Sequence, residues 1–188
     1  MTRVTPSREA TAELEVKGSR FIAVLVPLAR YGARLDTARK EHRKASHHVT
    51  ATRRVNDNDA IEDHASDDGE PAGTSGMPTL KTMMGAGIVD AGLIVTRYFG
   101  GTKLGTGGLA RAYSGAATLA IEGARLVPWH RIVTRTVAAP FAQGSALEQH
   151  LARLDLTILE RTYTETGVSL TVRGPQERVA QAALPEYR

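Results

Sequence analysis

The sequence contains no cysteine among its 188 residues, and only 5% of them are aromatic, with a single tryptophan. The absence of cysteine excludes a disulfide framework, a thiolate metal site and a cysteine nucleophile, and it fits a reducing compartment. The longest strongly apolar run, FIAVLVPLA at 21–29, is too short to span a bilayer, and the first residues have no apolar segment of the signal-peptide kind. We therefore expect a cytoplasmic protein without a membrane partner.

The charges that are present are unevenly distributed. The chain holds 24 Lys and Arg against 20 Asp and Glu, a net charge of +4. Residues 1–54 hold 12 Lys and Arg against 5 acids, whereas residues 55–70 hold 7 acids and neither Lys nor Arg. The basic excess favours anionic partners, and the acidic stretch is typical of a solvated polar loop.

Hydrophobic periodicity predicts an α+β fold in two domains, 1–128 and 131–188. In the first domain, alternating or continuously apolar runs predict strands at 11–16, 20–28, 47–55 and 90–99, and three- and four-residue spacing predicts helices at 32–45, 74–87 and 107–124. The second domain has the order β-α-β-β-α. Its helices are expected at 144–154 and 175–184, and its last two strands at 155–164 and 167–174.

The stretch RYFGGTKLGTGGLARAY, residues 97–113, follows a predicted buried strand and leads into a predicted helix. Free backbone amides and the positive end of the helix dipole would converge there and attract an anion. Alternatively, the glycines only allow a tight turn and the cations pair with acids. The candidate anion or nucleic-acid contacts are Arg97, Lys103, Arg111, Gly100, Gly101, Gly105, Gly107 and Gly108.

Two named phosphate motifs are not met in this stretch. A Walker A loop needs Lys followed by Ser or Thr, but Leu104 follows Lys103. GTGGLA at 105–110 satisfies a degenerate dinucleotide pattern, yet it begins six residues beyond the strand, and the expected acid is replaced by Glu122 on the helix.

The stretch SDDGEPAGTSG, residues 66–76, gathers three carboxylates within a turn shaped by glycine and proline. They could hold Mg²⁺, or they could pair with Arg97 or Arg111. The spacings of an EF-hand, a zinc site and a nucleophile elbow are absent, so we assign no catalytic residue and no dedicated metal site. The further groove candidates are His47, Tyr98, Phe99, Asp67, Asp68 and Glu70.

Four blocks in order resemble the signatures of the IMPACT/YigZ family: KGSRF at 17–21, ASHHVTA at 45–51, SDDGEPAGTSGMP at 66–78 and VTRYFGGTKLGTGGLARAYSGAA at 95–117. The resemblance implies a first domain similar to the second domain of ribosomal protein S5. It also implies a ferredoxin-like second domain similar to the last domain of a translocation elongation factor, here without its final strand. Eukaryotic members of the family regulate translation in the stress response to amino-acid starvation, through an additional N-terminal partner-binding domain that we do not find here.

Two functions follow as hypotheses. The first is a non-enzymatic, translation-associated regulatory protein that binds RNA, the ribosome or a ribosome-associated protein through Arg97, Lys103, Arg111 and the basic face of the 32–45 helix. The alternative is a Mg²⁺-dependent enzyme that holds a small-molecule phosphate or nucleotide at the glycine loop, with the metal at Asp67, Asp68 or Glu70.

Overall fold

The structure, a computed structural model, describes residues 2–184 and divides into two compact units, Met1–Trp129 and His130–Arg188. Each unit combines helices with an antiparallel sheet and has its own apolar core. The predicted α+β class is therefore confirmed. No helix in the described part of the chain is long and apolar enough to cross a membrane.

A five-stranded sheet forms the centre of the first unit, in the order β2-β3-β6-β4-β5, and every neighbouring pair is antiparallel. The strands are β2 (Ala10–Val16), β3 (Ser19–Pro27), β4 (His47–Val55), β5 (Ile61–Ser66) and β6 (Ala91–Tyr98). Two short strands, β1 (Val4–Pro6) and β7 (Leu126–Pro128), pair separately. Strand β6 is buried along nearly its whole length because it lies in the middle of the sheet with helices on both faces.

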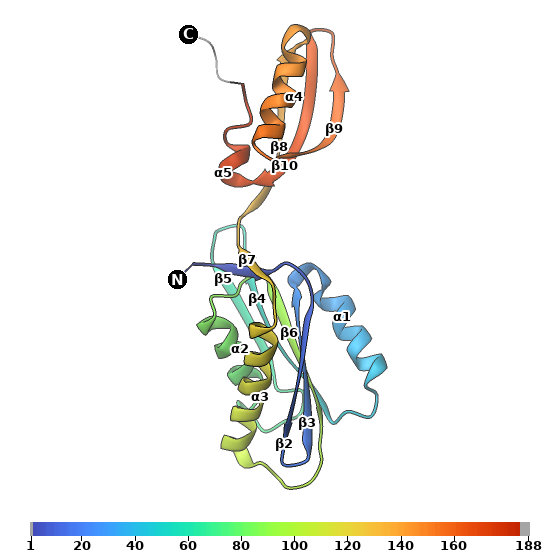
Figure 1. Ribbon diagram of the computed structural model, residues 1–188, viewed down its shortest axis with the longest axis vertical. Helices are drawn as coiled ribbons and strands as arrows, with labels where there is room; N and C mark the ends of the chain where they lie inside the picture. The colour runs from blue at the N-terminus through green and yellow to red at the C-terminus, as the bar shows by residue number, and fades with distance from the viewer. Residues whose placement is uncertain (1, 185–188) are drawn as a thin grey trace. The chain divides into compact units, whose positions relative to one another are not determined.

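The helices cover the sheet unequally, with α1 (Leu28–Glu41) on one face and α2 (Gly76–Gly85) and α3 (Gly105–Glu122) on the other (Figure 1). The alternation of β3 sends Phe21, Ala23 and Leu25 into the core beneath α3, where the ring of Tyr113 meets Phe21 edge to face. On the opposite face, Tyr31 of α1 lies so close to Gly92 that a Cβ there would overlap its ring.

The second unit is a three-stranded antiparallel sheet in the order β8-β10-β9 within the described residues. Its elements are β8 (Ile132–Pro140), the short 3-10 turn η1 (Phe141–Gln143), α4 (Gly144–Arg153), β9 (Thr157–Tyr163), β10 (Gly167–Pro175) and α5 (Gln176–Val179). The predicted β-α-β-β-α order is present. Leu147 and Leu151 of α4 pack onto Leu170 and Val172 of the central strand, which closes the core of this unit.

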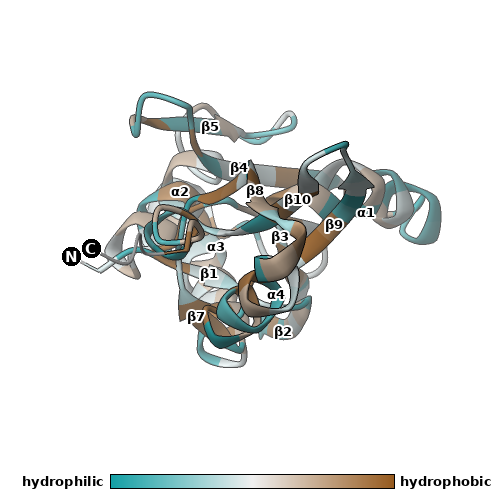
Figure 2. Cartoon of the chain, turned by 90° about the horizontal axis from the view of Figure 1, so that it is seen from above, coloured by the Kyte–Doolittle hydropathy of each residue, from teal (hydrophilic) through white to brown (hydrophobic). Residues whose placement is uncertain are grey.

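The structure corrects the sequence prediction at one missed strand and at two helix boundaries. The acidic segment 55–70 is not simply a loop, because β5 forms within it as an exposed edge strand paired to β4. The ribbon at and around β5 carries teal, hydrophilic segments in Figure 2. Helix α1 begins at Leu28, directly after Pro27 ends β3, rather than at residue 32. The helix predicted at 175–184 ends at Val179, since the chain then turns and Ala182 packs into the core.

Candidate functional site

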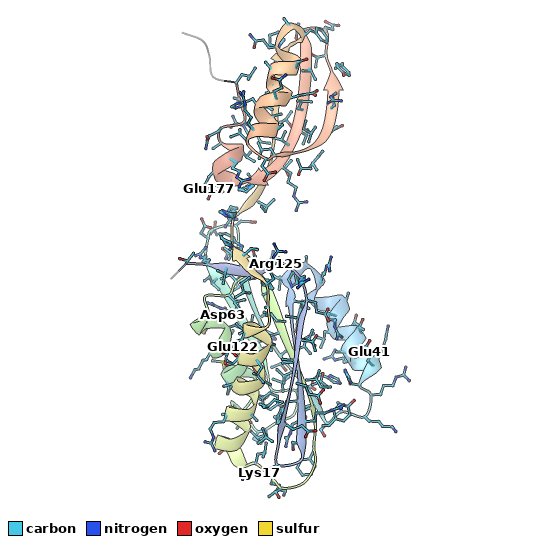
Figure 3. The ribbon with its side chains drawn as sticks, viewed as in Figure 1. Lys17, Glu41, Asp63, Glu122, Arg125 and Glu177 are labelled. Carbon is cyan, nitrogen blue, oxygen red and sulfur yellow. The ribbon has the colours of Figure 1, made fainter. Side chains whose placement is uncertain are left out.

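The four blocks that carry the family resemblance come together at one end of the first unit, which we call the signature end. Arg20 lies opposite Tyr98 in the sheet, and His47 lies opposite Arg97. The amide of Thr102 donates to the carbonyl of Lys17, so the loop between β6 and α3 lies against the β2–β3 turn. Figure 3 shows Lys17 at this end, whereas Glu122 and Arg125 lie toward the opposite end of α3.

Arg97 is buried beneath this end and is paired internally. Its Nη1 donates to Glu70 Oε1 at 2.7 Å, and the two side chains are only 6% and 3% exposed. Its Nη2 lies 3.4 Å from Ser19 Oγ, and its guanidinium lies over the rings of Phe21 and Phe99. The structure thus forms the pairing between Arg97 and an acid of the SDDGEP turn that was one of the sequence alternatives.

Glu70 is the centre of a larger buried network. Tyr113 Oη donates to the same Oε1 at 2.7 Å, and burial, together with Glu70, raises the pKa of Tyr113 far above its ordinary value. His47 donates from Nδ1 to the carbonyl oxygen of Asp68 at 2.8 Å, because a carbonyl can only accept, and this turns Nε2 to within 3.9 Å of Glu70. With Ser19 bound to Arg97, the network joins all four signature blocks.

Asp67 caps the start of α2. Its carboxylate accepts hydrogen bonds from the amides of Gly73, Ser75 and Gly76 and from Ser75 Oγ. Burial opposes ionisation of this carboxyl, but the bonds from Ser75, Gly73 and Gly76 together outweigh it, so the pKa of Asp67 is lowered. Asp67 is therefore a structural cap of α2. Its negative charge interacts favourably with the positive amino end of the helix dipole.

Asp68 closes the turn against β4. Its Oδ2 accepts from the amide of His48 at 2.6 Å, and both Asp68 and Gly69 have positive φ, as a tight turn of the primed type requires. Asp67, Asp68 and Glu70 thus serve three different partners, and within residues 2–184 no group of three carboxylates or histidines is placed to hold a metal ion. The arrangement does not support the Mg²⁺ hypothesis for these three residues.

The first glycines of the loop allow close approach of two backbone segments. A Cβ at Gly100 would overlap the carbonyl oxygen of Gly18, and one at Gly101 would overlap that of Lys17. The amide of Phe99 donates to Ser46 Oγ and that of Gly100 to Ser19 Oγ. These two amides are used inside the protein, so the first half of the loop is a packed turn.

The second half of the loop faces solvent. Lys103 and Arg111 are exposed, and α3 begins at Gly105 without a side-chain cap. Gly105 has positive φ, and Gly107 and Gly108 form the first turn of α3. Lys103 borders one surface hollow, with Phe99 and Leu109, and Arg111 borders another, with Leu14 and Val16. The structure therefore separates the three predicted cations: Arg97 is inside, and the other two lie outside at the start of α3.

The comparison with known proteins agrees with this geometry. Residues 17–121, which contain all four blocks, match the Impact N-terminal domain. The chain belongs to the IMPACT family. It is 35% identical to the IMPACT family member YigZ of Escherichia coli (strain K12) over 181 residues, 94% of this chain and 87% of that protein. It is 31% identical to the IMPACT family member YvyE of Bacillus subtilis (strain 168) over 156 residues, 81% of this chain and 71% of that one. A crystal structure described as a hypothetical protein matches with a TM-score of 0.71 at 33% identity, covering 97% of this chain and 90% of its own.

The IMPACT domain also contains a cluster of exposed cations at the end of α1. Arg39, Lys40, Arg43 and Lys44 are all exposed, and none of them forms an ion pair with a carboxylate of residues 2–184. We call these four residues the α1 basic cluster. The one acid within the run, Glu41, is directed to Arg34.

The α1 basic cluster is joined to the signature end through polar contacts. His42 Nδ1 lies 3.0 Å from Tyr98 Oη, and the guanidinium of Arg20 lies over the ring of Tyr98. Burial and the positive charge of Arg39 lower the pKa of His48, although Asp68 acts in the opposite direction. Arg39 of the cluster is thus close enough to act on His48 of β4.

Two members of the buried network around Glu70, Ser19 and Tyr113, were not among the candidate site residues predicted from the sequence. Ser19 is fully buried and binds both the Gly100 backbone and Arg97. Tyr113 lies on the buried apolar stripe of α3, a setting that its spacing in the sequence favours and that does not by itself indicate a polar partner. The signal that could have identified them is position: both lie inside the signature blocks, and both carry a hydroxyl where an apolar core would not need one.

Proposed function

We propose that this IMPACT family member is a non-enzymatic, translation-associated protein whose first unit binds the phosphates of RNA, free or within the ribosome, at the signature end. The observation that carries the proposal is the α1 basic cluster. Four exposed cations within six positions, without a carboxylate partner in the described chain, form the kind of surface that phosphate groups neutralise.

Lys103 and Arg111 extend this proposed surface toward α3. The uncapped amino end of α3 lies between them in sequence, and its amides favour an anion. Arg97 contributes indirectly, because its pair with Glu70 holds the β6 end against the SDDGEP turn. The surface we propose therefore keeps Lys103, Arg111 and the basic face of the 32–45 helix from the sequence hypothesis and leaves out Arg97, which is buried.

The aromatic residue beside the cluster, Tyr98, already makes contacts within the protein, so we assign the contact at the cluster to charge and shape and not to stacking on Tyr98. Tyr98 is engaged on one side by Arg20 and at its hydroxyl by His42. A stacked base would have to displace one of these contacts. The link to translation rests on the family resemblance, since eukaryotic IMPACT proteins regulate translation and the first unit resembles a ribosomal protein domain.

The experiment is charge reversal with a matched control. The double variant Arg43→Glu/Lys44→Glu changes two exposed cations of the cluster, and Lys81→Glu changes one exposed cation on α2. We measure binding of a fluorescent single-stranded RNA by anisotropy, and of ribosomes by sedimentation, over a range of salt concentrations.

We expect the double variant to bind more weakly and to reduce the slope of log affinity against log salt by about 1.4, because each phosphate contact contributes about 0.7 for a single strand. Lys81→Glu should leave both quantities unchanged. Equal affinities and slopes for wild type and the folded double variant would refute the proposed surface.

A further inference from the structure

A mostly apolar hollow of about 240 Å³ lies at the start of α3. Its walls include Phe99, Leu104 and Leu109, and Glu70 and Arg97 lie among its lining residues. Drug-sized ligands need pockets of about 300–1,000 Å³, so this hollow suits one planar ring rather than a larger molecule.

Glu70, which lines the hollow, has one carboxylate oxygen without a hydrogen-bond donor among the described residues. Glu70 Oε1 receives both Arg97 and Tyr113, but Oε2 accepts no hydrogen bond from any residue of 2–184. The only fully buried side-chain atom without a partner in that range is Arg97 Nε. Glu70 Oε2 is therefore not completely closed off from solvent, although the Glu70 side chain is only 3% exposed, and Glu70 is one of the residues that line the hollow. A carboxylate oxygen in this position calls for a donor such as an amino group.

The wall of the hollow includes an exposed aromatic ring. Phe99 is 52% exposed, and the Arg97 guanidinium lies 5.4 Å from the centre of its ring. One side of the ring is thus supported by a buried, ion-paired cation, while about half of the side chain remains open to solvent. A large apolar side chain kept exposed on a rigid support is typical of a stacking platform.

The rim of the hollow suits a phosphate. Lys103 and the first residues of α3, Gly105 and Thr106, border it. Helix α3 has 18 residues and no side-chain cap at its amino end, so its first amides have no capping side chain and its dipole favours a negative charge.

We propose that this hollow, which we call the Phe99 hollow, binds one unpaired nucleobase that carries an exocyclic amino group, such as cytosine. The base stacks on Phe99 and donates its amino group to Glu70 Oε2, and its phosphate lies at Lys103 and the start of α3. Uracil presents a carbonyl oxygen in place of the amino group, which the carboxylate would repel. The inference rests on the proposed RNA-binding function and adds to it a preference among bases.

A peptide terminus is the other ligand whose chemistry this hollow could match, with an apolar side chain on Phe99 and a carboxylate at α3. The free acceptor at Glu70 favours the base, because an apolar side chain offers it no donor and would leave the carboxylate oxygen without a partner. The test distinguishes the two.

The test compares ten-residue oligo(C) and oligo(U) RNA by fluorescence anisotropy, with each pair of affinities measured at the same salt concentration and the series repeated over a range of salt. Wild type is expected to bind oligo(C) at least about fivefold more tightly. Phe99→Ala should weaken oligo(C) binding by about 5- to 100-fold and remove the preference, without changing the salt slope. Phe141→Ala removes an equally exposed phenylalanine of the second unit and should change nothing. Phe99→Trp should retain the preference, which separates stacking from a folding defect.

The outcomes separate this inference from the proposed function. If oligo(C) and oligo(U) bind equally and Phe99→Ala has no effect, while Arg43→Glu/Lys44→Glu weakens both, the base site is refuted and the phosphate surface stands. If wild type binds neither RNA, both are refuted. If a peptide ending in a free-carboxylate phenylalanine binds wild type but not Phe99→Ala, and RNA binding is unaffected by that variant, the hollow is a peptide site and the base inference is overturned.

Discussion

Replacing Glu70 by alanine should destabilise the first unit strongly, because the substitution leaves a charge buried without its partner. Arg97 is only 6% exposed, and its Nη1 would lose the 2.7 Å bond to Glu70. Removing one member of a buried ion pair costs about 3–5 kcal/mol. Tyr113 would lose its acceptor as well, at about 1–3 kcal/mol, although these costs overlap because they share one carboxylate.

We therefore expect the free energy of unfolding to fall by about 4 kcal/mol, and the urea midpoint to fall by about 2 M for a slope near 2 kcal/mol/M. The measurement is urea unfolding followed by the fluorescence of Trp129, the single tryptophan, whose Nε1 donates to Asp90 within the first unit at 2.6 Å. The matched control is Glu13→Ala, which removes an exposed ion pair to Arg20 at 3.6 Å and should cost about 0–1 kcal/mol.

The double variant Glu70→Met/Arg97→Met should recover much of the loss, since two apolar side chains of similar volume need no charge partner. If Glu70→Ala costs no more than Glu13→Ala, the buried network does not hold the signature end together, and our account of Arg97 as an internal residue is refuted.

Two further predictions concern the loop and the cap. Gly100→Ala should lower the free energy of unfolding by about 1–3 kcal/mol in thermal unfolding, because the new Cβ would overlap Gly18. The control Gly32→Ala, at an open position on α1, should raise it by about 0.5–1 kcal/mol. Equal effects of the two substitutions would contradict the packed turn. Asp67→Ala should cost about 0.5–2 kcal/mol at pH 7. Because folding lowers the pKa of Asp67 below 3.8, the carboxylate stabilises the fold above that pH, and this stabilisation is lost as the pH falls through the pKa of the folded state. The difference in free energy of unfolding between wild type and Asp67→Ala should therefore shrink in urea unfolding near pH 2.5. A difference that does not change with pH would contradict a cap formed by the ionised carboxylate.

The sequence predicted the fold well where one face of an element is buried. The strand at 47–55 matches β4 in both bounds, because Val49, Ala51 and Val55 alternate toward the core. It failed at β5, whose residues are mostly exposed, so no apolar alternation marks it. An edge strand of this kind is defined by its pairing with β4, which is a long-range property that local patterns do not contain.

The site was predicted by region but not by role. Arg97 follows a buried run, and the strand period places its side chain on the same face as Val95, toward the core. A guanidinium buried there needs a carboxylate to pair with its charge. That acid, Glu70, is separated by 27 positions, so composition could suggest the pair but not select it. Asp67 and Asp68 are neighbours in sequence, but the turn between β5 and α2 sends them to different partners.

The most direct test of the central claim is an NMR titration of the isotope-labelled chain with a ten-residue RNA, followed through its backbone amide signals. We predict that the shifts gather at the signature end, in residues 39–46 and 99–108, and that they weaken as salt is raised. Shifts confined to the opposite end, around Glu122 and Arg125, or no shifts at low salt, would contradict the claim that IMPACT family residues of the first unit bind RNA there.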